Sequence, residues 1–302
     1  MQMNLESQNK EIVAEVKQAI ASGSLGEWVE PWISKGMPTN LSTGRIYSGM
    51  WNQRILHKAF SQRIFRAHSW ATFSQIRKIG GRVLKGEHGV GIIMPKVITE
   101  KSPDETDENR QMYFRSVAVF NIEQTNLKLS DYFVDPKPPK ALNQDEAYQW
   151  IKAIKHRLKG TENAPAYDDN EDAIHMPAID TFATKEDYFA SYFHELGHWT
   201  RHKDRLNRGS KYKDPEAAYA FEELVAELSS AYVTAFLGYK TNLQHKEYIQ
   251  WWYTQMEAEP AIISRAGALA SRAFNYLANF APDHMMLRFN TSKIAHTNGD
   301  EA

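Results

Sequence analysis

The sequence contains no cysteine among its 302 residues, which excludes disulfide bonds and thiolate metal sites. It has no apolar run long enough to span a membrane, and residues 1–10 are polar, without the apolar core of a signal peptide. Repeats at solenoid spacing are absent, and Lys85-Gly86 lacks the rest of a phosphate-binding P-loop. We therefore expect a cytoplasmic protein without membrane contact or a nucleoside triphosphate site.

The formal net charge of −1 gives no overall polyelectrolyte character, and a hydrophobic content of 42% is that of a folded protein. A chain of this length accommodates two domains. Three prolines within residues 135–140 favour an extended connector. The sequence therefore predicts a two-domain α+β protein, with a first domain at residues 1–134, a linker at 135–142 and a second domain at 143–302.

Hydrophobic periodicity and turn residues predict the elements of both domains. The expected helices cover residues 5–20, 50–65, 70–79, 143–158, 244–258 and 260–280. The expected strands cover residues 92–94, 113–122 and 173–177, the last as an edge strand that could bind extended substrate. Residues 99–110 are expected to form an acidic loop, and residues 203–213 a basic loop between two helices.

One motif in the second half carries specific chemistry. His194, Glu195 and His198 spell H-E-x-x-H, with Thr184 as a candidate helix N-cap upstream. On a helix, the two histidines lie one turn apart on the same face, so both imidazoles can reach one metal ion. Glu195 is then the candidate catalytic residue, placed to deprotonate a metal-bound water.

A second predicted helix supplies carboxylates for the same site. Glu223 and Glu227 lie one turn apart on a largely apolar segment, residues 221–232. A catalytic metal site with two histidines needs a third protein ligand and leaves one position open. We predict Glu223 as that ligand and Glu227 as the outer hydrogen-bond partner of a ligand histidine. The alternative is that Glu222, Glu223 and Glu227 form a solvated helix face.

Positive charge and aromatic rings are concentrated near the N-terminus. Between residues 20 and 98, eleven lysines and arginines stand against three glutamates, a surplus of eight positive charges. Cations that follow phosphates and rings that stack on bases are typical of single-strand binding. Turn-rich segments display side chains, and the DNA-binding candidates drawn from them are Trp32, Lys35, Arg45, Tyr47, Arg82 and Lys85. The alternative is that the rings form core and the charges are ordinary surface.

Both halves resemble one known family. The segment from Trp28 to Tyr47, together with Gly80-Gly81 and residues 85–87 and 119–121, resembles the N-terminal single-stranded-DNA-binding domain of ArdC-type antirestriction proteins. That domain also begins certain plasmid primases. The second half, with its H-E-x-x-H motif and residues 222–227, resembles the zincin-like metallopeptidase domain that follows in the same family. The resemblance implies binding of incoming single-stranded DNA and its protection from host restriction during conjugation.

Two functions follow as hypotheses. In the first, the chain is a DNA-binding antirestriction protein whose metal domain is peptidase-like. In the second, it is mainly a zinc metallopeptidase, directed to DNA or DNA-bound proteins by its first domain. Imidazole and carboxylate ligands suit Zn²⁺, with Mn²⁺ as another divalent candidate. The expected partners are single-stranded DNA and a protein or peptide substrate that the sequence does not name.

Overall fold

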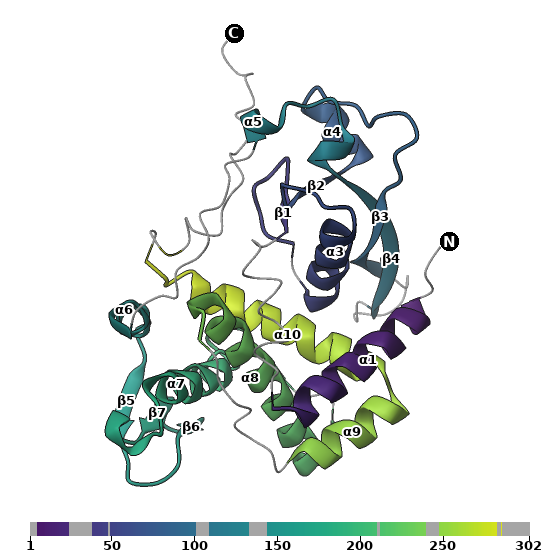
Figure 1. Ribbon diagram of the computed structural model, residues 1–302. Coiled ribbons are helices and arrows are strands. Elements are labelled where there is room, and N and C mark those ends of the chain that lie inside the picture. The colour runs from purple at the N-terminus through teal and green to yellow at the C-terminus, as the bar shows by residue number, and fades with distance from the viewer. Residues whose placement is uncertain are drawn as a thin grey trace. The chain divides into compact units, whose positions relative to one another are not determined.

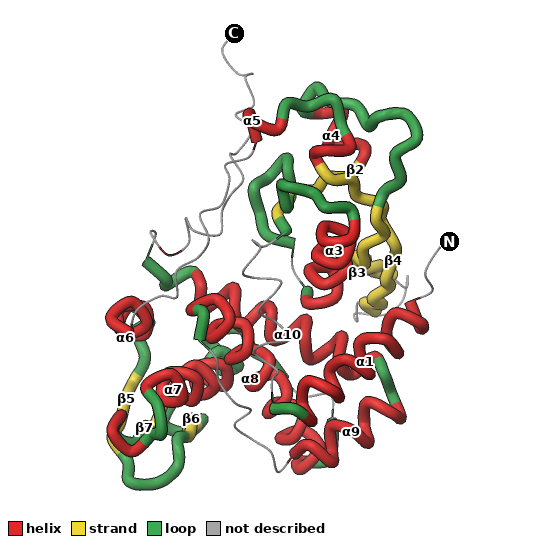
Figure 2. Tube along the Cα trace, in the orientation of Figure 1, coloured by secondary structure: helices red, strands yellow, loops and turns green. Residues whose placement is uncertain are grey.

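The computed structural model describes residues 5–23, 38–47, 49–100, 109–132, 144–209, 212–239, 248–282 and 285. The chain divides into two compact units (Figure 1). We call the one made of Pro38–Tyr47 and Trp51–Asp135 the sheet unit, and the one that contains Met1–Met37 and Pro136–Phe289 the helical unit. The predicted α+β class with two domains is confirmed, and Figure 2 shows how unevenly strands and helices are shared between them.

The sheet unit is built on a four-stranded sheet of order β1-β2-β4-β3. Its strands are β1 (Thr39–Asn40), β2 (Ser69–Thr72), β3 (Val90–Glu100) and β4 (Asn109–Asn121). β1 is parallel to β2, whereas β4 pairs antiparallel with β2 and β3. The other elements are α3 (Met50–Gln62), α4 (Phe73–Lys78), η1 (Ile122–Gln124) and α5 (Leu129–Tyr132).

The two faces of this sheet bury different clusters. Successive strand residues point to opposite faces, and in β2 Trp70 packs with Leu56 of α3, whereas Ala71 packs with Ile76 of α4. The prediction of a helix from residue 70 is therefore wrong at its start. Residues 70–72 pair with β4, and the helix begins only where Thr72 and Gln75 form a capping box.

The helical unit is built around α8 (Pro215–Leu237), whose side chains are buried from Ala220 to Leu237. α7 (Lys185–Trp199) and α10 (Ala261–Ala278) pack against it, and α7 lies beside α8 in Figure 1. α7 and α8 approach closely because Gly197 has no side chain: a Cβ there would lie 3.3 Å from the Ala226 Cα. The remaining elements are α6 (Gln144–Ala153), η2 (Ile179–Thr181) and α9 (Ile249–Ala258).

A small sheet of order β5-β7-β6 completes this unit. Its strands are β5 (Arg157–Gly160), β6 (Ala166–Asp168) and β7 (Ala173–Met176). The helix expected to reach residue 158 ends at Ala153, and β5 follows it. β7 was expected to be an edge strand, but it lies between two neighbours, so its backbone is already paired and cannot take up a substrate strand.

The first helix, α1 (Leu5–Ala21), packs against α9 and α10, although the prediction placed it in the first domain. Lys17 pairs with Glu257 at 2.5 Å, and the Tyr253 hydroxyl donates to the Lys17 carbonyl at 2.8 Å. The helical periodicity reveals the apolar stripe of α1 but not the element that covers it. The predicted linker and the boundaries at 134 and 143 lie outside the described residues and stay predictions.

The predicted acidic loop, residues 99–110, is shorter than expected. Thr99 and Glu100 pair with Arg110 and Asn109 at the end of the β3–β4 ladder, and residues 101–108 lie outside the described part of the chain. None of the helices in the described ranges combines the length and apolar composition that crossing a lipid bilayer requires.

Candidate metal centre

The H-E-x-x-H motif lies on α7, as its spacing predicts. The Thr184 hydroxyl accepts from the Asp187 amide at 3.0 Å and caps the helix, and Glu186 and Asp187 in the first turn complement the helix dipole. Every residue from Tyr188 to Trp199 is buried. The helix is therefore held on all sides, and its two histidines project from a fixed backbone.

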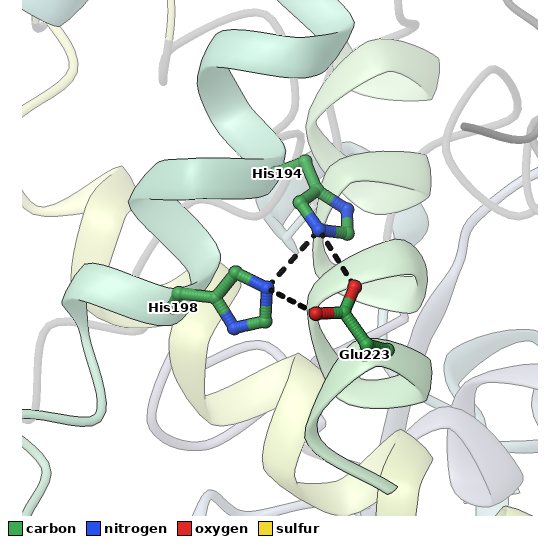
Figure 3. Close-up of side chains that lie close together, drawn as sticks. All are labelled: His194, His198 and Glu223. Atoms are coloured by element: carbon green, nitrogen blue, oxygen red, sulfur yellow. Dashed lines mark hydrogen bonds and ion pairs between the residues drawn. The ribbon is translucent and has the colours of Figure 1, made fainter. Parts of the chain in front are cut away.

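His194, His198 and Glu223 converge from α7 and α8 (Figure 3). Their ligand atoms lie within 4.8 Å of one another. The two histidine Nε2 atoms are 3.1 Å apart, the Glu223 carboxylate lies 3.2 Å from Nε2 of His194, and 3.4 Å separates it from Nε2 of His198. Two nitrogens and a carboxylate aimed at one point require a shared proton or a cation between them.

Burial and charge act against each other in this cluster. Burial lowers the pKa of His198, but hydrogen bonds to Glu222 and Glu223 outweigh it and raise that pKa to about 10. Burial also raises the pKa of Glu223, but hydrogen bonds from both histidines lower it well below its ordinary value. The site thus favours a positive charge between these side chains, and two imidazoles with one carboxylate are a donor set that fits Zn²⁺ or Mn²⁺.

Glu222, Glu223 and Glu227 of α8 are all buried, with Glu223 only 1% exposed. The alternative of a solvated helix face is therefore wrong. Glu227 lies near the outer nitrogen of His194, as predicted for an outer partner, although 3.9 Å between its carboxylate and Nδ1 exceeds a hydrogen bond. Glu195 is also buried, and its charge helps to raise the pKa of His198.

The sequence interpretation missed two residues at the site. The first is Glu222, which lies 3.5 Å from Nδ1 of His198. A metal-ligating histidine usually has a carboxylate or carbonyl partner at its outer nitrogen, so the two histidines of the motif indicate two such partners. Tyr219 lies one turn before Glu223, bonds to it, and remains 50% exposed. The sequence does indicate this contact, because Tyr219 lies four residues before Glu223 and therefore on the same face of the helix.

Three arginines lie between the end of α7 and the start of α8, two of them in the predicted basic loop. Each pairs with a carboxylate: Arg201 with Asp169, Arg205 with Asp172 and Arg208 with Glu222. Lys203 and Lys213 of the loop are exposed. Arg205 also stacks over the Trp199 ring, with its guanidinium 4.0 Å from the ring centre. These pairs attach the segment after α7 to the β6–β7 turn and to α8.

The DNA-binding candidates belong to the sheet unit, apart from Trp32 and Lys35, which lie outside the described residues. Arg45, Arg82 and Lys85 are exposed, as expected for side chains in turns. Tyr47 is different: it is half-buried against the Leu56–Trp70 cluster. Its hydroxyl donates to the Trp70 carbonyl at 3.1 Å and accepts from Asn40 at 3.0 Å, and burial raises its pKa to about 12.

The aromatic rings of the basic stretch are divided between core and surface. Trp51 and Trp70 are buried, so the core alternative is correct for them. Phe73, at the start of α4, is 51% exposed and was not among the selected candidates. Arg77 and Lys78, also exposed, end the same short helix. Phe73 directly follows β2, and the register in which β2 pairs with β4 decides which side chains are covered. The sequence pattern does not reveal that register.

The comparisons with known proteins match both halves of the chain, and the match to the first half includes α1 of the helical unit. Residues 145–269 match the zincin-like metallopeptidase family, and residues 6–120 match the N-terminal domain of anti-restriction factor ArdC. Fold and site thus define a two-domain protein, in which an ArdC-type N-terminal domain is followed in the sequence by a zincin-like metallopeptidase domain. The chain therefore has the two-domain architecture of ArdC-type antirestriction proteins.

Among related sequences, the chain is 27% identical over 303 residues to a DNA primase TraC of Escherichia coli, across 89% of this chain and 20% of the relative. A second TraC of Escherichia coli is 27% identical across 84% of this chain and 25% of the relative. The chain therefore spans a fifth to a quarter of the length of these relatives. The uncharacterized protein y4eC of Sinorhizobium fredii is 25% identical across 88% of this chain and 90% of its own length.

Two solved structures of the antirestriction protein ArdC from plasmid R388 are similar throughout. The metal-free structure has a TM-score of 0.63 and 28% identity, and covers 92% of this chain and 98% of its own. The Mn(II)-bound structure has a TM-score of 0.61 and 27% identity, and covers 93% of this chain and 99% of its own.

Proposed function

We propose that this chain is an antirestriction protein that binds incoming single-stranded DNA with its sheet unit and carries a divalent-metal, peptidase-like site in its helical unit. One observation carries the metal site: His194, His198 and Glu223 converge in a buried cluster, with Glu195 in the same helical turn as the histidines. The similarity to ArdC of plasmid R388, which also has an Mn(II)-bound structure, supports both the antirestriction role and a divalent ion.

In this proposal, Nε2 of His194, Nε2 of His198 and the Glu223 carboxylate hold Zn²⁺ or Mn²⁺. The ion supplies a Lewis acid, which polarises the scissile carbonyl and makes water easier to deprotonate. Glu195 takes the proton from the attacking water and returns it to the leaving amine. Glu222 and Glu227 lie on the outer sides of the two rings, 3.5 Å from Nδ1 of His198 and 3.9 Å from Nδ1 of His194, and their charges favour a proton on these nitrogens.

Substitution of Glu195 distinguishes the proposed antirestriction function from the alternative of a metallopeptidase. Glu195→Gln is expected to retain the metal and to lose at least about 100-fold of any peptide hydrolysis, because the general base is removed while the ligands remain. Metal content and cleavage of a peptide library measure these two results. His175→Gln, which changes a half-buried histidine of β7, is the control.

The same variant should be tested for protection of plasmid DNA during conjugation into a restricting host. In the proposed function, Glu195→Gln protects as well as the wild type, because the sheet unit binds the DNA. Loss of protection with normal DNA binding would favour the alternative, a metallopeptidase that its first domain directs to DNA or DNA-bound proteins.

DNA binding by the sheet unit makes a prediction about salt. Affinity for single strands should fall by about 0.7 log units per tenfold increase in salt for each phosphate neutralised. Arg45→Gln and Lys85→Gln should each lower that slope, because both side chains are exposed. Lys155→Gln, an exposed residue of the helical unit, is the control. A slope near zero, or equal affinity for duplex DNA, would contradict the proposal.

Because Tyr47 is half-buried, two substitutions are needed to separate stacking of its ring on a base from the structural role of its hydroxyl. Tyr47→Ala should weaken DNA binding at every salt concentration if the ring stacks on a base, by roughly 1–3 kcal/mol. Tyr47→Phe keeps the ring but removes the hydroxyl that bonds to Trp70 and Asn40. It should leave DNA affinity unchanged and lower stability by about 1 kcal/mol. Equal DNA affinity for Tyr47→Ala and the wild type would remove Tyr47 from the DNA site.

A further inference from the structure

We propose that Arg208 is a positioning residue of the metal centre: it holds Glu222 away from the ligand cluster, where Glu222 orients His198. The inference rests on the proposed metal site and adds a residue to it. Arg208 follows α7 in the chain, and Glu222 is the residue just before the ligand Glu223. The proposal therefore explains how a loop outside the motif controls which carboxylate of α8 can act as a ligand.

Both oxygens of the Glu222 carboxylate are engaged by one guanidinium. Nη2 of Arg208 donates to Oε1 at 2.5 Å, and Nε donates to Oε2 at 3.2 Å. The side chains are buried, with 3% of Arg208 and 9% of Glu222 exposed. A bidentate pair at this depth fixes the plane of the carboxylate as well as its position.

Arg208 is itself fixed by the end of α7. Its Nη1 donates to the Thr200 hydroxyl at 2.7 Å, and its Nη2 donates to the Gly197 carbonyl at 2.9 Å. The Thr200 hydroxyl donates to the same carbonyl at 2.6 Å. Gly197 directly precedes the ligand His198, so the guanidinium joins the backbone of the metal helix to a carboxylate of α8.

These bonds hold the Glu222 carboxylate near Nδ1, the outer nitrogen of His198. Glu222 Oε1 lies 3.5 Å from Nδ1, whereas Nε2 of His198 faces Glu223 and His194. A proton on Nδ1 leaves Nε2 as the lone-pair donor that a metal requires. Arg208 thus sets the tautomer of His198 by setting the place of Glu222.

Charge explains why the restraint is needed. Glu195, Glu222, Glu223 and Glu227 are four buried carboxylates around two imidazoles, and Arg208 is a buried cation that pairs with one of them. Without Arg208, the Glu222 carboxylate would be attracted toward the other positive charge of the proposed site, the metal ion. A second carboxylate ligand would occupy the position that a catalytic site leaves open.

Arg208→Gln in the full chain tests the proposal, with Arg205→Gln as the matched control. Both residues are arginines of the loop after α7 with mostly buried side chains, but Arg205 pairs with Asp172, which does not contact a ligand histidine in the described structure. Both variants should lose thermal stability in the metal-free state. Only Arg208→Gln should weaken Zn²⁺ binding, by about tenfold or more in a chelator competition.

Two further variants refine the result. Arg208→Lys should restore only part of the affinity, because an ammonium cannot hold both carboxylate oxygens in one plane. In the double variant Arg208→Gln/Glu222→Gln, Zn²⁺ should bind no more weakly than in Arg208→Gln, because residues that act as one unit have non-additive effects. Unchanged Zn²⁺ affinity in Arg208→Gln would overturn the proposal and leave Arg208 as a loop anchor.

A metal-independent measurement separates this inference from the proposed function. Long-range ¹H–¹⁵N spectra of the metal-free protein report the protonation and hydrogen bonding of both nitrogens of His198. The His198 signals should change in Arg208→Gln and stay as in the wild type in Arg205→Gln. If the wild type takes up no Zn²⁺, the proposed metal site fails, and these spectra alone then decide: unchanged His198 signals in Arg208→Gln overturn the positioning role.

Discussion

His194→Ala and Glu223→Ala are each expected to abolish tight binding of a divalent ion, whereas Glu195→Ala should retain it. The two nitrogens and the carboxylate of the cluster lie within 4.8 Å of one another, so removing one leaves only two ligands for the ion. Stoichiometric metal content and calorimetric titration with Zn²⁺ and Mn²⁺ measure the loss. The expected effect is complete loss at micromolar metal, the largest change predicted for this protein.

A second group of metal-ligating side chains provides the control. Asp168, Glu171 and His175 also lie close together, but Glu171 is exposed and bonds to Lys159. His175→Ala should therefore leave tight metal binding intact. If Glu223→Ala keeps full metal and Glu227→Ala loses it, the roles assigned to these two glutamates are reversed.

Acid should destabilise the sheet unit through His68. This imidazole is 2% exposed and accepts from the Trp70 indole at 3.1 Å through Nδ1. Burial, with a smaller contribution from the charge of His57, lowers the pKa of His68 from 6.5 to about 3. A proton on Nδ1 would remove the acceptor of the indole and place a charge in the core.

The sign of the pH dependence follows from the lowered pKa. Between about pH 6.5 and 3 the unfolded chain carries a proton on His68 that the folded chain excludes, so the free energy of unfolding falls as the pH falls through this window. The stabilisation is fully present above pH 6.5. Its loss amounts to roughly 4 kcal/mol by pH 3.

Urea unfolding at a series of pH values, followed by hydrogen exchange of peptides from β2 and β4, measures this slope. His68→Asn should be less stable at neutral pH but should lack the His68 part of the slope. Ser69→Ala, which changes the adjacent buried side chain, should lower the whole curve and leave the slope as it is. A wild-type slope retained in His68→Asn would contradict this account of the buried imidazole.

The local chemistry of the metal centre is determined by the sequence. The i, i+4 spacing places His194 and His198 on one face of α7, and the Thr184 cap starts that helix where the pattern predicts. The helix that carries Glu223 and the burial of its apolar neighbours also follow from periodicity. These features depend on residues within one or two turns of each other, and a helix of fixed pitch converts their spacing directly into geometry.

The tertiary structure alone decided which distant groups complete each environment. Arg208 reaches Glu222, Tyr47 packs under Trp70, β7 lies between two strands, and α1 packs with α9 and α10. A periodic pattern shows that a side chain will be covered, but not which element covers it. That choice depends on how whole faces pack together, and the resulting neighbours set the burial, the charge and the pKa of groups such as His68 and His198.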